Sequence, residues 1–400
     1  MANAPPVTVP ELDLDPFAPA FFDDPYPGHT AVRETASVVM LRPHGCFATG
    51  RHAEIRAMLD NWQDYVSGRG VGITDYAHAP PLRGPGMLLE TDPPVHTRRR
   101  AVVNKVLSPA VVRALRAPFA AAAERIVGRA VAMGRCDGIA DLAEAYPLAV
   151  FPDALGMPAQ GRENLLPFGS FVFNAMGPNN ALLQASLAEL PPLAAWVTTQ
   201  SRREALAPGG FGMALHEAAD AGDITPEEAA LLVRALLSAG VDTTVNAIGA
   251  ALYCLARFPA EWDRLRAQPS HARNAFEEAI RYECPVQTFF RTTARPVELG
   301  GTPIPEGSKV LMFLAAANRD PRRWDDPDRY DITRPTAGHV GFGAGIHMCV
   351  GQVLARLEGE AVLTALARRV ARIEITDTPV RRHNNTLRGL ATLPLRLHPA

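Results

Sequence analysis

The sequence has few cysteines and no cysteine pair motif. Its 400 residues include five cysteines, and no two of them are spaced as CxxC. A disulfide framework or a zinc ribbon needs closely spaced pairs, so we exclude both kinds of protein. An isolated cysteine usually behaves as a small buried apolar residue. We expect this of four of them, Cys46, Cys136, Cys254 and Cys284.

The sequence also lacks an excess of charge and a long apolar run. The formal net charge is −2, with 40 basic and 42 acidic residues, so no basic domain for nucleic acid is expected. No apolar run reaches the roughly 18 residues of a membrane span. The N-terminal residues lack the basic start and apolar core of a secretory signal. We therefore expect a soluble, cytoplasmic protein that binds neither nucleic acid nor a membrane.

No linker, repeat or low-complexity segment divides the chain, so we expect a single domain over residues 1–400. Helical patterns dominate, and short strand patterns lie early and late. The fold class expected is therefore mainly α with small peripheral β-sheets. The expected helices cover residues 101–134, with a break near Ser108 and Pro109, and residues 224–258, 270–283 and 350–370. The expected strands lie within residues 38–50, 289–314 and 391–399.

The helix expected over residues 224–258 is long and apolar on nearly all its faces. It begins with a Thr225 cap followed by Pro226, a typical helix start. A helix without a polar face belongs in the interior. We expect it to cross the core.

The fifth cysteine, Cys349, lies in the stretch FGAGIHMCVG, residues 342–351. Glycines there allow positive φ angles and a close approach of the backbone to a bulky group. A helix pattern starts at residue 350, and the free N–H groups at a helix start favour a thiolate. A thiolate without cysteine or histidine partners fits one axial bond to a metal that is held elsewhere, as in haem.

Phe342, Gly345, Cys349 and Gly351 match FxxGxxxCxG, so the chain resembles the cytochrome P450 family. Similar motifs follow in family order over nearly the whole chain. The resemblance implies haem b between the long central helix and the cysteine-loop helix, with Cys349 as iron ligand. It implies a haem-thiolate monooxygenase that uses O₂.

A pair of charged residues, Glu278 and Arg281, lies at i and i+3 on one predicted helix. Alone, such a pair would be a surface ion pair of little energetic value. The resemblance implies instead a buried network with a third arginine from the irregular segment 318–347. We assign Arg329 to that place. Such a network would fix the backbone that presents Cys349.

Four basic residues match the positions that bind the haem propionates in the family: His96, Arg100, Arg291 and His347. Arginine and protonated histidine satisfy carboxylates. Phe342, at the start of the motif, is expected to contact the haem. Each basic residue alone could be a solvated surface charge. His339, close to the motif, is interpreted as structural.

The stretch AGVDTT, residues 239–244, interrupts the apolar helix with an acid and two threonines. It resembles the oxygen-activating site of the family, in which Asp242 would relay protons and Thr243 would stabilise the bound oxygen. Gly240 would let the backbone approach a ligand. The alternative is a threonine hydroxyl bonded to its own helix.

The resemblance also implies partners. We expect no flavin or nicotinamide domain, so electrons would come from a [2Fe–2S] ferredoxin with an NADH-dependent ferredoxin reductase. A basic face would meet the acidic donor. The candidate residues for it, which could also be a solvated face, are Arg98, Arg99, Arg100, Lys105 and Arg113.

Longer stretches, such as GRENLLPFGSFVFNAMGP and NAFEEAIRYECPVQTFFRTT, look very like the branch that oxidises para-substituted benzoates such as 4-methoxybenzoate. The resemblance implies a small aromatic acid whose carboxylate meets Arg83, with Arg234 nearby and Ser238 as a further hydrogen-bonding group. The reaction would be O-demethylation or hydroxylation at the para position. The expected slot residues are Leu88, Leu89, Phe173, Met176, Ala239, Val286 and Phe289.

Three positions depart from that branch. Gly86 and Ala235 stand where it has serines, and Met176 stands where it has phenylalanine. Two lost hydrogen bonds to a charged group could cost about 1.5–3 kcal/mol each. Open alternatives are a monooxygenase for another small hydrophobic substrate and a non-catalytic haem sensor. A peroxide-using relative is disfavoured by the intact Asp242–Thr243 pair.

Overall fold

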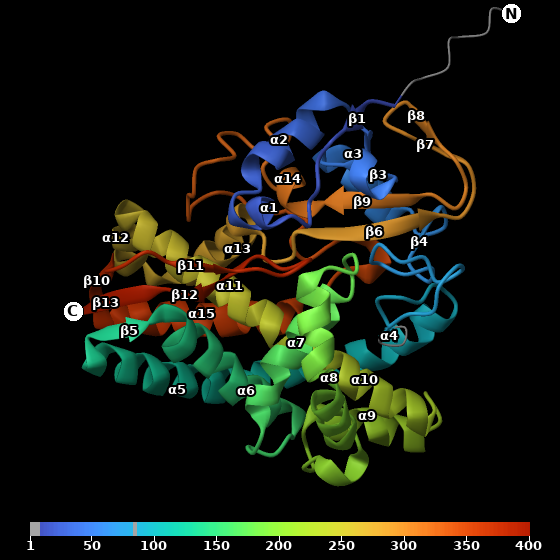
Figure 1. Ribbon diagram of the computed structural model, residues 1–400. Coiled ribbons are helices and arrows are strands. Elements are labelled where there is room, and N and C mark those ends of the chain that lie inside the picture. Colours follow the sequence, from blue (N-terminus) through green and yellow to red (C-terminus); the bar gives the residue numbers. More distant parts are fainter. Residues whose placement is uncertain (1–8, 83–85) are drawn as a thin grey trace, which may run out of the picture.

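The structure, a computed structural model, describes residues 9–82 and 86–400. Helices form most of it, and the main sheet lies to one side (Figure 1). The α-helices are α1 Pro19–Asp23, α2 Tyr26–Thr35, α3 His52–Asp60, α4 Val95–Val106, α5 Pro109–Met133, α6 Ala145–Leu155, α7 Leu165–Asn174, α8 Ala181–Gln200, α9 Phe211–Asp220, α10 Pro226–Gly240, α11 Asp242–Arg257, α12 Pro259–Ala267, α13 Ala272–Glu283, α14 Leu314–Ala317 and α15 Gln352–Arg369. The mainly α fold class is confirmed.

The main sheet joins N-terminal strands to strands from residues 288–313. Its strand order is β1-β2-β3-β9-β6-β4, and the blue N-terminal strands lie beside the orange strands β9 and β6 in Figure 1. Strands β6 and β9 pair antiparallel, which places Arg291 opposite Val310. Smaller sheets have the orders β10-β13-β5, β11-β12 and β7-β8. The strands are β1 Glu11–Leu12, β2 Val39–Leu41, β3 Cys46–Thr49, β4 Tyr65–Val66, β5 Arg135–Asp137, β6 Thr288–Thr293, β7 Val297–Leu299, β8 Thr302–Ile304, β9 Lys309–Phe313, β10 Val370–Ile375, β11 Val380–Arg382, β12 Gly389–Thr392 and β13 Pro394–Pro399.

The core lies where α15 packs between α5 and α13, with α11 against α13. Leu354, Leu357, Leu363 and Leu366 of α15 are buried, as the spacing of its apolar residues predicts. Most residues of α11 are also buried, so the expected crossing of the core by this segment is confirmed. Packing on several sides fixes α15, and with it the loop that precedes it.

The expected single helix over residues 224–258 is instead two helices, α10 and α11, separated at Val241. The cause is local. The Thr243 hydroxyl donates to the Ala239 carbonyl (2.7 Å) and the Thr244 hydroxyl to the Gly240 carbonyl (3.1 Å). Such side-chain bonds compete with the regular helix ladder.

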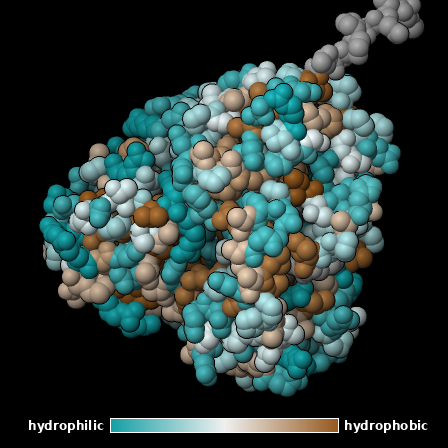
Figure 2. Space-filling model, in the orientation of Figure 1, coloured by the Kyte–Doolittle hydropathy of each residue, from teal (hydrophilic) through white to brown (hydrophobic). Residues whose placement is uncertain are grey.

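The joined segment Pro226–Arg257 is long and apolar enough to pass a composition test for a membrane span. However, 61% of its most apolar window is buried inside the protein, as in a core helix. The face drawn in Figure 2 is mostly hydrophilic, with separate hydrophobic patches. Burial in the core therefore accounts for the apolar character of this segment.

The start of α10 is held by a capping box and two arginines. The Thr225 side chain accepts from the Glu228 N–H (3.1 Å), and the Glu228 carboxylate accepts from the Thr225 N–H (2.9 Å). Arg98 and Arg99 of α4 also donate to Glu228, at 2.6 and 3.0 Å. These bonds, led by the one from Arg98, lower the pKa of Glu228 to about 2 although burial opposes the shift. Glu228 therefore ties α4 to α10.

We predict that Glu228→Gln lowers the free energy of unfolding by about 1–3 kcal/mol at pH 7, because charge-assisted hydrogen bonds are lost. A lowered acid pKa stabilises the fold above its unfolded value and stops doing so as the pH falls through the folded value. The difference should therefore narrow toward pH 2, where wild-type Glu228 is also protonated. Urea unfolding at several pH values checks this. The control is Glu227→Gln, an exposed neighbour; equal effects of both variants would contradict the prediction.

Candidate functional site

The cysteine loop runs from Phe342 through the short turn Gly345–His347 to Cys349, just before α15. The Cys349 N–H donates to the Phe342 carbonyl at 2.8 Å and closes the loop. Gly345 has φ +62°, and a Cβ there would collide with the Leu59 carbonyl. Glycine is required at this position because only it combines that backbone angle with so close a contact.

Opposing effects act on the pKa of the Cys349 thiol. Burial raises its pKa, whereas the Gly351 and Gln352 N–H groups and the charges of Arg100 and Arg356 lower it. The net direction is upward, so the helix start does not by itself produce a thiolate. A metal cation bonded to the sulfur would remove the proton.

A buried ion pair lies behind this loop. Arg281 donates to both carboxylate oxygens of Glu278, at 2.7 and 2.8 Å, and both side chains are 0% exposed. Arg281 also donates to the carbonyls of Asn318 (2.8 Å) and Pro327 (2.9 Å). The pair thus connects α13 to the irregular segment that leads to Cys349.

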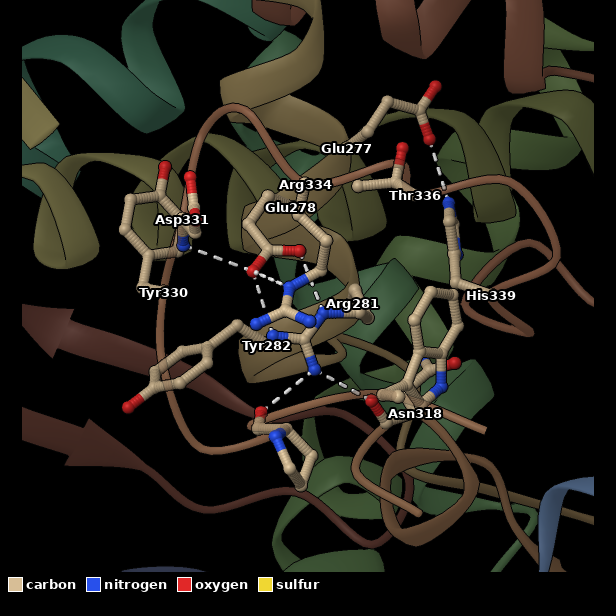
Figure 3. Close-up of polar contacts among 12 residues, drawn as sticks. Glu277, Glu278, Arg281, Tyr282, Asn318, Tyr330, Asp331, Arg334, Thr336 and His339 are labelled. Atoms are coloured by element: carbon tan, nitrogen blue, oxygen red, sulfur yellow. Dashed lines mark hydrogen bonds and ion pairs between the residues drawn. The ribbon is translucent and has the colours of Figure 1, made fainter. Parts of the chain in front are cut away.

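The third arginine of this network is Arg334, which corrects the assignment of Arg329. Arg334 Nε lies 3.0 Å from Glu278 Oε1, the oxygen to which Arg281 also donates (Figure 3). The Arg329 side chain is 54% exposed and lies 3.6 Å from Asp331. Only its carbonyl takes part, accepting from Arg281 at 3.1 Å. The Asp331 N–H also reaches Glu278, at 3.2 Å, so the backbone turns around the carboxylate and places the side chain of residue 334, not 329, on it.

A second cluster, which sequence reasoning missed, joins His339, Glu277 and Arg356. His339 Nε2 lies 2.7 Å from Glu277, and Arg356 of α15 is hydrogen-bonded to the same carboxylate. The Arg356 guanidinium lies 4.5 Å from the centre of the Phe342 ring. The centre of the His339 ring lies 5.7 Å from the same ring centre. The structural interpretation of His339 agrees with this geometry. The sequence feature that could have indicated this cluster is the second acid, Glu277, next to Glu278.

Three of the expected propionate residues form a buried basic group. The rings of His96 and His347 are 4.5 Å apart, and in the described chain neither Nε2 has a hydrogen-bond partner. Burial, with the charge of His347, lowers the pKa of His96 to about 4. Arg291 is 3% exposed, and burial lowers its pKa to about 10. Asp92 is the nearby acid, with Oδ1 3.9 Å from His347 Nε2, beyond hydrogen-bond range.

Arg100, the fourth expected propionate residue, contacts the cysteine loop directly. It donates to the carbonyls of Ile346 (3.4 Å) and Met348 (2.7 Å). It therefore supports the backbone on either side of His347 and lies next to Cys349. These basic residues come from α4, β6 and the loop, and buried ring nitrogens without hydrogen-bond partners in the described chain favour an anionic ligand that can accept from them.

The break between α10 and α11 presents Asp242 and Thr243. Asp242 is 4% exposed, and burial raises its pKa to about 6. The side-chain amide of Asn246 donates to the Asp242 carbonyl at 2.9 Å. Gly240 does approach a bulky group closely, but that group is the Phe151 ring, which a Cβ would strike. This contact is a packing reason for glycine at residue 240, and the expected approach of its backbone to a ligand stays a prediction.

Comparison with known proteins decides the family. Residues 270–397 match the family described as "Cytochrome P450". Over 393 residues the chain is 61% identical to "Cytochrome p450 CYP199A2" of Rhodopseudomonas palustris, which covers 98% of this chain and 95% of that protein. The chain belongs to the cytochrome P450 family.

Two further similarities agree with this cytochrome P450 assignment. "Cytochrome P450 monooxygenase PikC" of Streptomyces venezuelae is 33% identical over 398 residues, covering 97% of this chain and 94% of that one. The structure of cytochrome P450 CYP109Q5 from Chondromyces apiculatus superposes with a TM-score of 0.82 at 30% identity, covering 98% of this chain and 100% of that one. The protein is thus a cytochrome P450 monooxygenase, which requires O₂ and electrons from a redox partner.

Cytochromes P450 use haem b, and the residues present fit it. A thiol sulfur suits iron, and haem has two carboxylates for the buried nitrogens described above. The His96 and His347 Nε2 atoms, buried without a partner in the described chain, are the donors such carboxylates need. Phe342 is partly buried at the start of the same loop.

The expected substrate residues divide into three sets. Arg83 lies outside the described residues. Arg234 and Ser238 of α10 line a cavity of about 240 Å³. The slot residues do not line that cavity: Leu88, Leu89, Val286 and Phe289 are partly buried against the core, Phe173 and Met176 are buried, and Ala239 is exposed.

We predict that Arg334→Ala lowers the free energy of unfolding by about 1.5–3 kcal/mol, because a charge-assisted bond to buried Glu278 is lost. The haem content of the purified protein should fall as well, since the loop bearing Cys349 depends on this network. Urea unfolding and the haem-to-protein absorbance ratio measure both effects. The matched control is Arg329→Ala, expected within about 0.5 kcal/mol of wild type. A larger effect at residue 329 than at residue 334 would restore the original assignment.

Proposed function

We propose that this cytochrome P450 oxidises a small aromatic acid at the para position of a benzoate-like ring, by O-demethylation or hydroxylation. The observation that carries the proposal is the face of α10. Arg234 and Ser238 line an apolar cavity there, and the same helix leads to Asp242 and Thr243. A single positive group in an apolar cavity suits a small organic anion. The similarity to CYP199A2 supports the assignment to this branch of the family.

In this proposal the Cys349 sulfur binds the haem iron, and His96, Arg291 and His347 bind the propionates. Arg100 is the fourth basic residue of this propionate site. When bound, haem b activates O₂ and oxidises a C–H bond. The role of the protein is to hold the cysteine, neutralise the carboxylates and orient the substrate. The two networks around Glu278 and Glu277 hold the cysteine loop from behind.

Asp242 and Thr243 are the proposed proton-handling residues. An acid with a pKa near 6 can both accept and donate a proton close to neutral pH. The Thr243 hydroxyl proton is bonded to the Ala239 carbonyl, so the oxygen presents its lone pairs as acceptors. Thr243 could thus order a water or an oxygen ligand, while Asp242 passes protons from the interior side.

We predict that Asp242→Asn stabilises the protein and slows turnover. A raised acid pKa gives stability that is present below about pH 3.8 and lost as the pH rises through about 6. At pH 8 the variant avoids a buried charge, so its free energy of unfolding should exceed that of wild type by about 2–3 kcal/mol. Product formation should fall about 100-fold, a typical value for a lost acid–base group.

Urea unfolding between pH 4 and pH 8, with product and NADH counted in a reconstituted system, tests the Asp242→Asn variant. The control is Asp263→Asn, at an exposed position on α12. If stability at pH 8 does not rise, Asp242 carries no buried charge. If turnover is unchanged, the proton-handling role is wrong.

The proposed substrate leads to a direct binding prediction. Titration of the purified ferric protein with 4-methoxybenzoate should shift the Soret band toward the high-spin form in a saturable way. The carboxylate of the acid is proposed to lie near Arg234 and Arg83, with the para substituent directed toward the haem. Ser238→Ala is the control variant and should bind the acid as wild type does. In the described chain the Ser238 hydroxyl donates only to the Ala235 carbonyl, at 3.0 Å. No shift with this acid would reject the para-substituted benzoate assignment and leave the monooxygenase family intact.

The electron donor is proposed to be a [2Fe–2S] ferredoxin with an NADH-dependent reductase, all cytoplasmic. The basic residues expected for the docking face differ in their pairing within the protein. Arg98 and Arg99 are paired with Glu228, and Lys105, which is exposed, lies 3.5 Å from Asp223. Further arginines surround a hollow of about 160 Å³. Arg116 is paired there with Glu360 and Arg356 with Glu277, whereas Arg113 and Arg273 have no acid partner in the described chain. Val353 lies among them.

Exposed apolar residues accompany this basic hollow. Met348, beside Cys349, is 40% exposed, and Val353 at the start of α15 is 51% exposed. An apolar centre with a basic rim suits a small acidic protein. Arg356 lies on the Phe342 ring, so this surface borders the loop that bears the proposed iron ligand.

A further inference from the structure

Lysine is rare in this chain, and one lysine lies in an unusual environment. Of the 40 lysine and arginine residues, only Lys105 and Lys309 are lysines. Lys309 begins β9, opposite Thr292 of β6 in the main sheet (Figure 1), and is partly buried. A buried lysine is usually paired with an acid. In the described chain, the ammonium of Lys309 is instead bonded to backbone oxygens.

Three carbonyls of one turn bind this ammonium. Lys309 Nζ donates to the carbonyls of Arg69 (3.2 Å), Gly70 (2.8 Å) and Gly72 (3.0 Å). An ammonium has three donors, so these bonds use all of them. Burial lowers the pKa of Lys309 to about 8, and the charged form therefore still predominates at pH 7. Carbonyl oxygens that converge on one positive charge form a cation site, as in the filters of K⁺ channels.

The shape of this site is a physical reason for lysine at residue 309. A lysine ammonium is a compact point charge with rotatable donors, whereas the donors of arginine are spread over a rigid plane. Carbonyls that converge on one point therefore suit an ammonium better than a guanidinium. The chain uses arginine at almost all its other cationic positions, and the lysine here is thus a specific choice.

An acid holds the same turn, residues 67–73, by its N–H groups. The Asp92 carboxylate accepts from the Ser67 N–H at 3.0 Å and from the Gly68 N–H at 2.8 Å. Gly70 has φ +95°, a backbone angle that favours glycine. Lys309 and Asp92 therefore fix the carbonyls and the N–H groups of the 67–73 turn from two separate parts of the chain.

The 67–73 turn packs on Met176, one of the expected slot residues, in the connection between α7 and α8. The Ile73 N–H donates to the Met176 carbonyl at 2.8 Å. A Cβ on Gly72 would collide with the Met176 backbone, so the two segments are in direct contact. The Phe290 N–H of β6 donates to the Val71 carbonyl, also at 2.8 Å. The position of the turn therefore determines the position of Met176 relative to the main sheet.

We propose that Lys309 is a positioning residue for the substrate, whose ammonium acts as the internal cation of a carbonyl site and holds the 67–73 turn against Met176. Without the ammonium, three carbonyls lose their partner, and the turn moves to find water. A free primary ammonium ion of matching size can occupy the same carbonyls once the side chain is removed. This inference rests on the proposed slot for a small aromatic acid and adds a residue outside the slot on which binding depends.

The test uses the holoenzyme of Lys309→Ala, which lacks a group of the size of n-propylammonium. In a Soret titration at pH 7, the Kd for 4-methoxybenzoate should rise about tenfold, the effect of one lost hydrogen bond. n-Propylammonium chloride should restore most of the affinity. 1-Propanol, which has a similar shape and no charge, should not. A purely structural loss of packing would respond to both additives alike.

Two variants serve as controls for this titration. Lys309→Met keeps the length of the side chain without its charge, so it should lose affinity and should not respond to n-propylammonium, because the methionine fills the site. Arg295→Ala removes an exposed positive charge just after β6 and should bind the acid as wild type does. The same salt added to wild type gives the baseline for any direct effect on the spectrum.

Amide hydrogen exchange tests the cation site without any substrate. The Ile73 N–H is bonded to Met176, and the Tyr76 N–H donates to the Arg69 carbonyl at 3.1 Å. Both amides should exchange about tenfold faster in Lys309→Ala, because local opening of the turn becomes easier. Added n-propylammonium should slow their exchange again.

The two measurements separate this inference from the proposed function. If the exchange results hold but 4-methoxybenzoate does not shift the spectrum of wild type, the proposed function fails and the cation site stands. If Lys309→Ala binds the acid as tightly as wild type, the positioning role is overturned and the proposed function stands. If n-propylammonium restores no more than 1-propanol does, the charge does not hold the turn, and the inference fails. If Lys309→Ala loses haem, Lys309→Met replaces it in the exchange measurement, where exchange equal to that of wild type overturns the inference.

Discussion

The fully buried carboxylate of Glu278 is the constraint on which the rest of the site depends. A charge without solvent must be paired from several directions, and here Arg281, Arg334 and the Asp331 N–H share it. These groups come from α13 and from the irregular segment, so the carboxylate determines where that segment can lie. The Glu277 cluster with His339 and Arg356 adds a connection to α15. Side chains of α13 and α15 thereby fix the position of a loop that has little regular structure.

The basic group of His96, His347 and Arg291 differs in its charge balance from the networks around Glu278 and Glu277. Behind the loop, opposite charges balance, whereas His96, His347 and Arg291 form a buried group whose nearby acid, Asp92, stays beyond hydrogen-bond distance. Burial is the main cause of the lowered pKa values of His96 and Arg291, and the charge of His347 adds to it at His96. A protein tolerates such an arrangement when a ligand supplies the missing charge, and the two carboxylates of haem b do so. The cofactor is thus part of the electrostatic balance of the fold.

Much of this could be predicted from the sequence, for physical reasons that differ by element. The breaks at Ser108–Pro109 and the start of α15 follow from strong local signals, and the cysteine loop follows from its glycines. Three features could not be predicted. The choice of Arg334 over Arg329 depends on how the backbone turns around Glu278, which local patterns do not encode. The division of the long helix at Val241 depends on threonine hydroxyls that could equally have faced elsewhere. The pairing of Arg98 and Arg99 with Glu228 depends on a tertiary contact between α4 and α10.

That division at Val241 has an evolutionary consequence. Since α10 and α11 are separate helices, the proposed substrate residues Arg234 and Ser238 lie on one, and the proposed proton-handling residues Asp242 and Thr243 begin the other. Substitutions at Ala235 or Ser238 change the lining of the cavity without altering the hydrogen-bond ladder of α11. Mutations on α10 can therefore alter the proposed substrate contacts while the residues that begin α11 stay unchanged. The interruption in the helix lets these two sets of residues evolve with little constraint on each other.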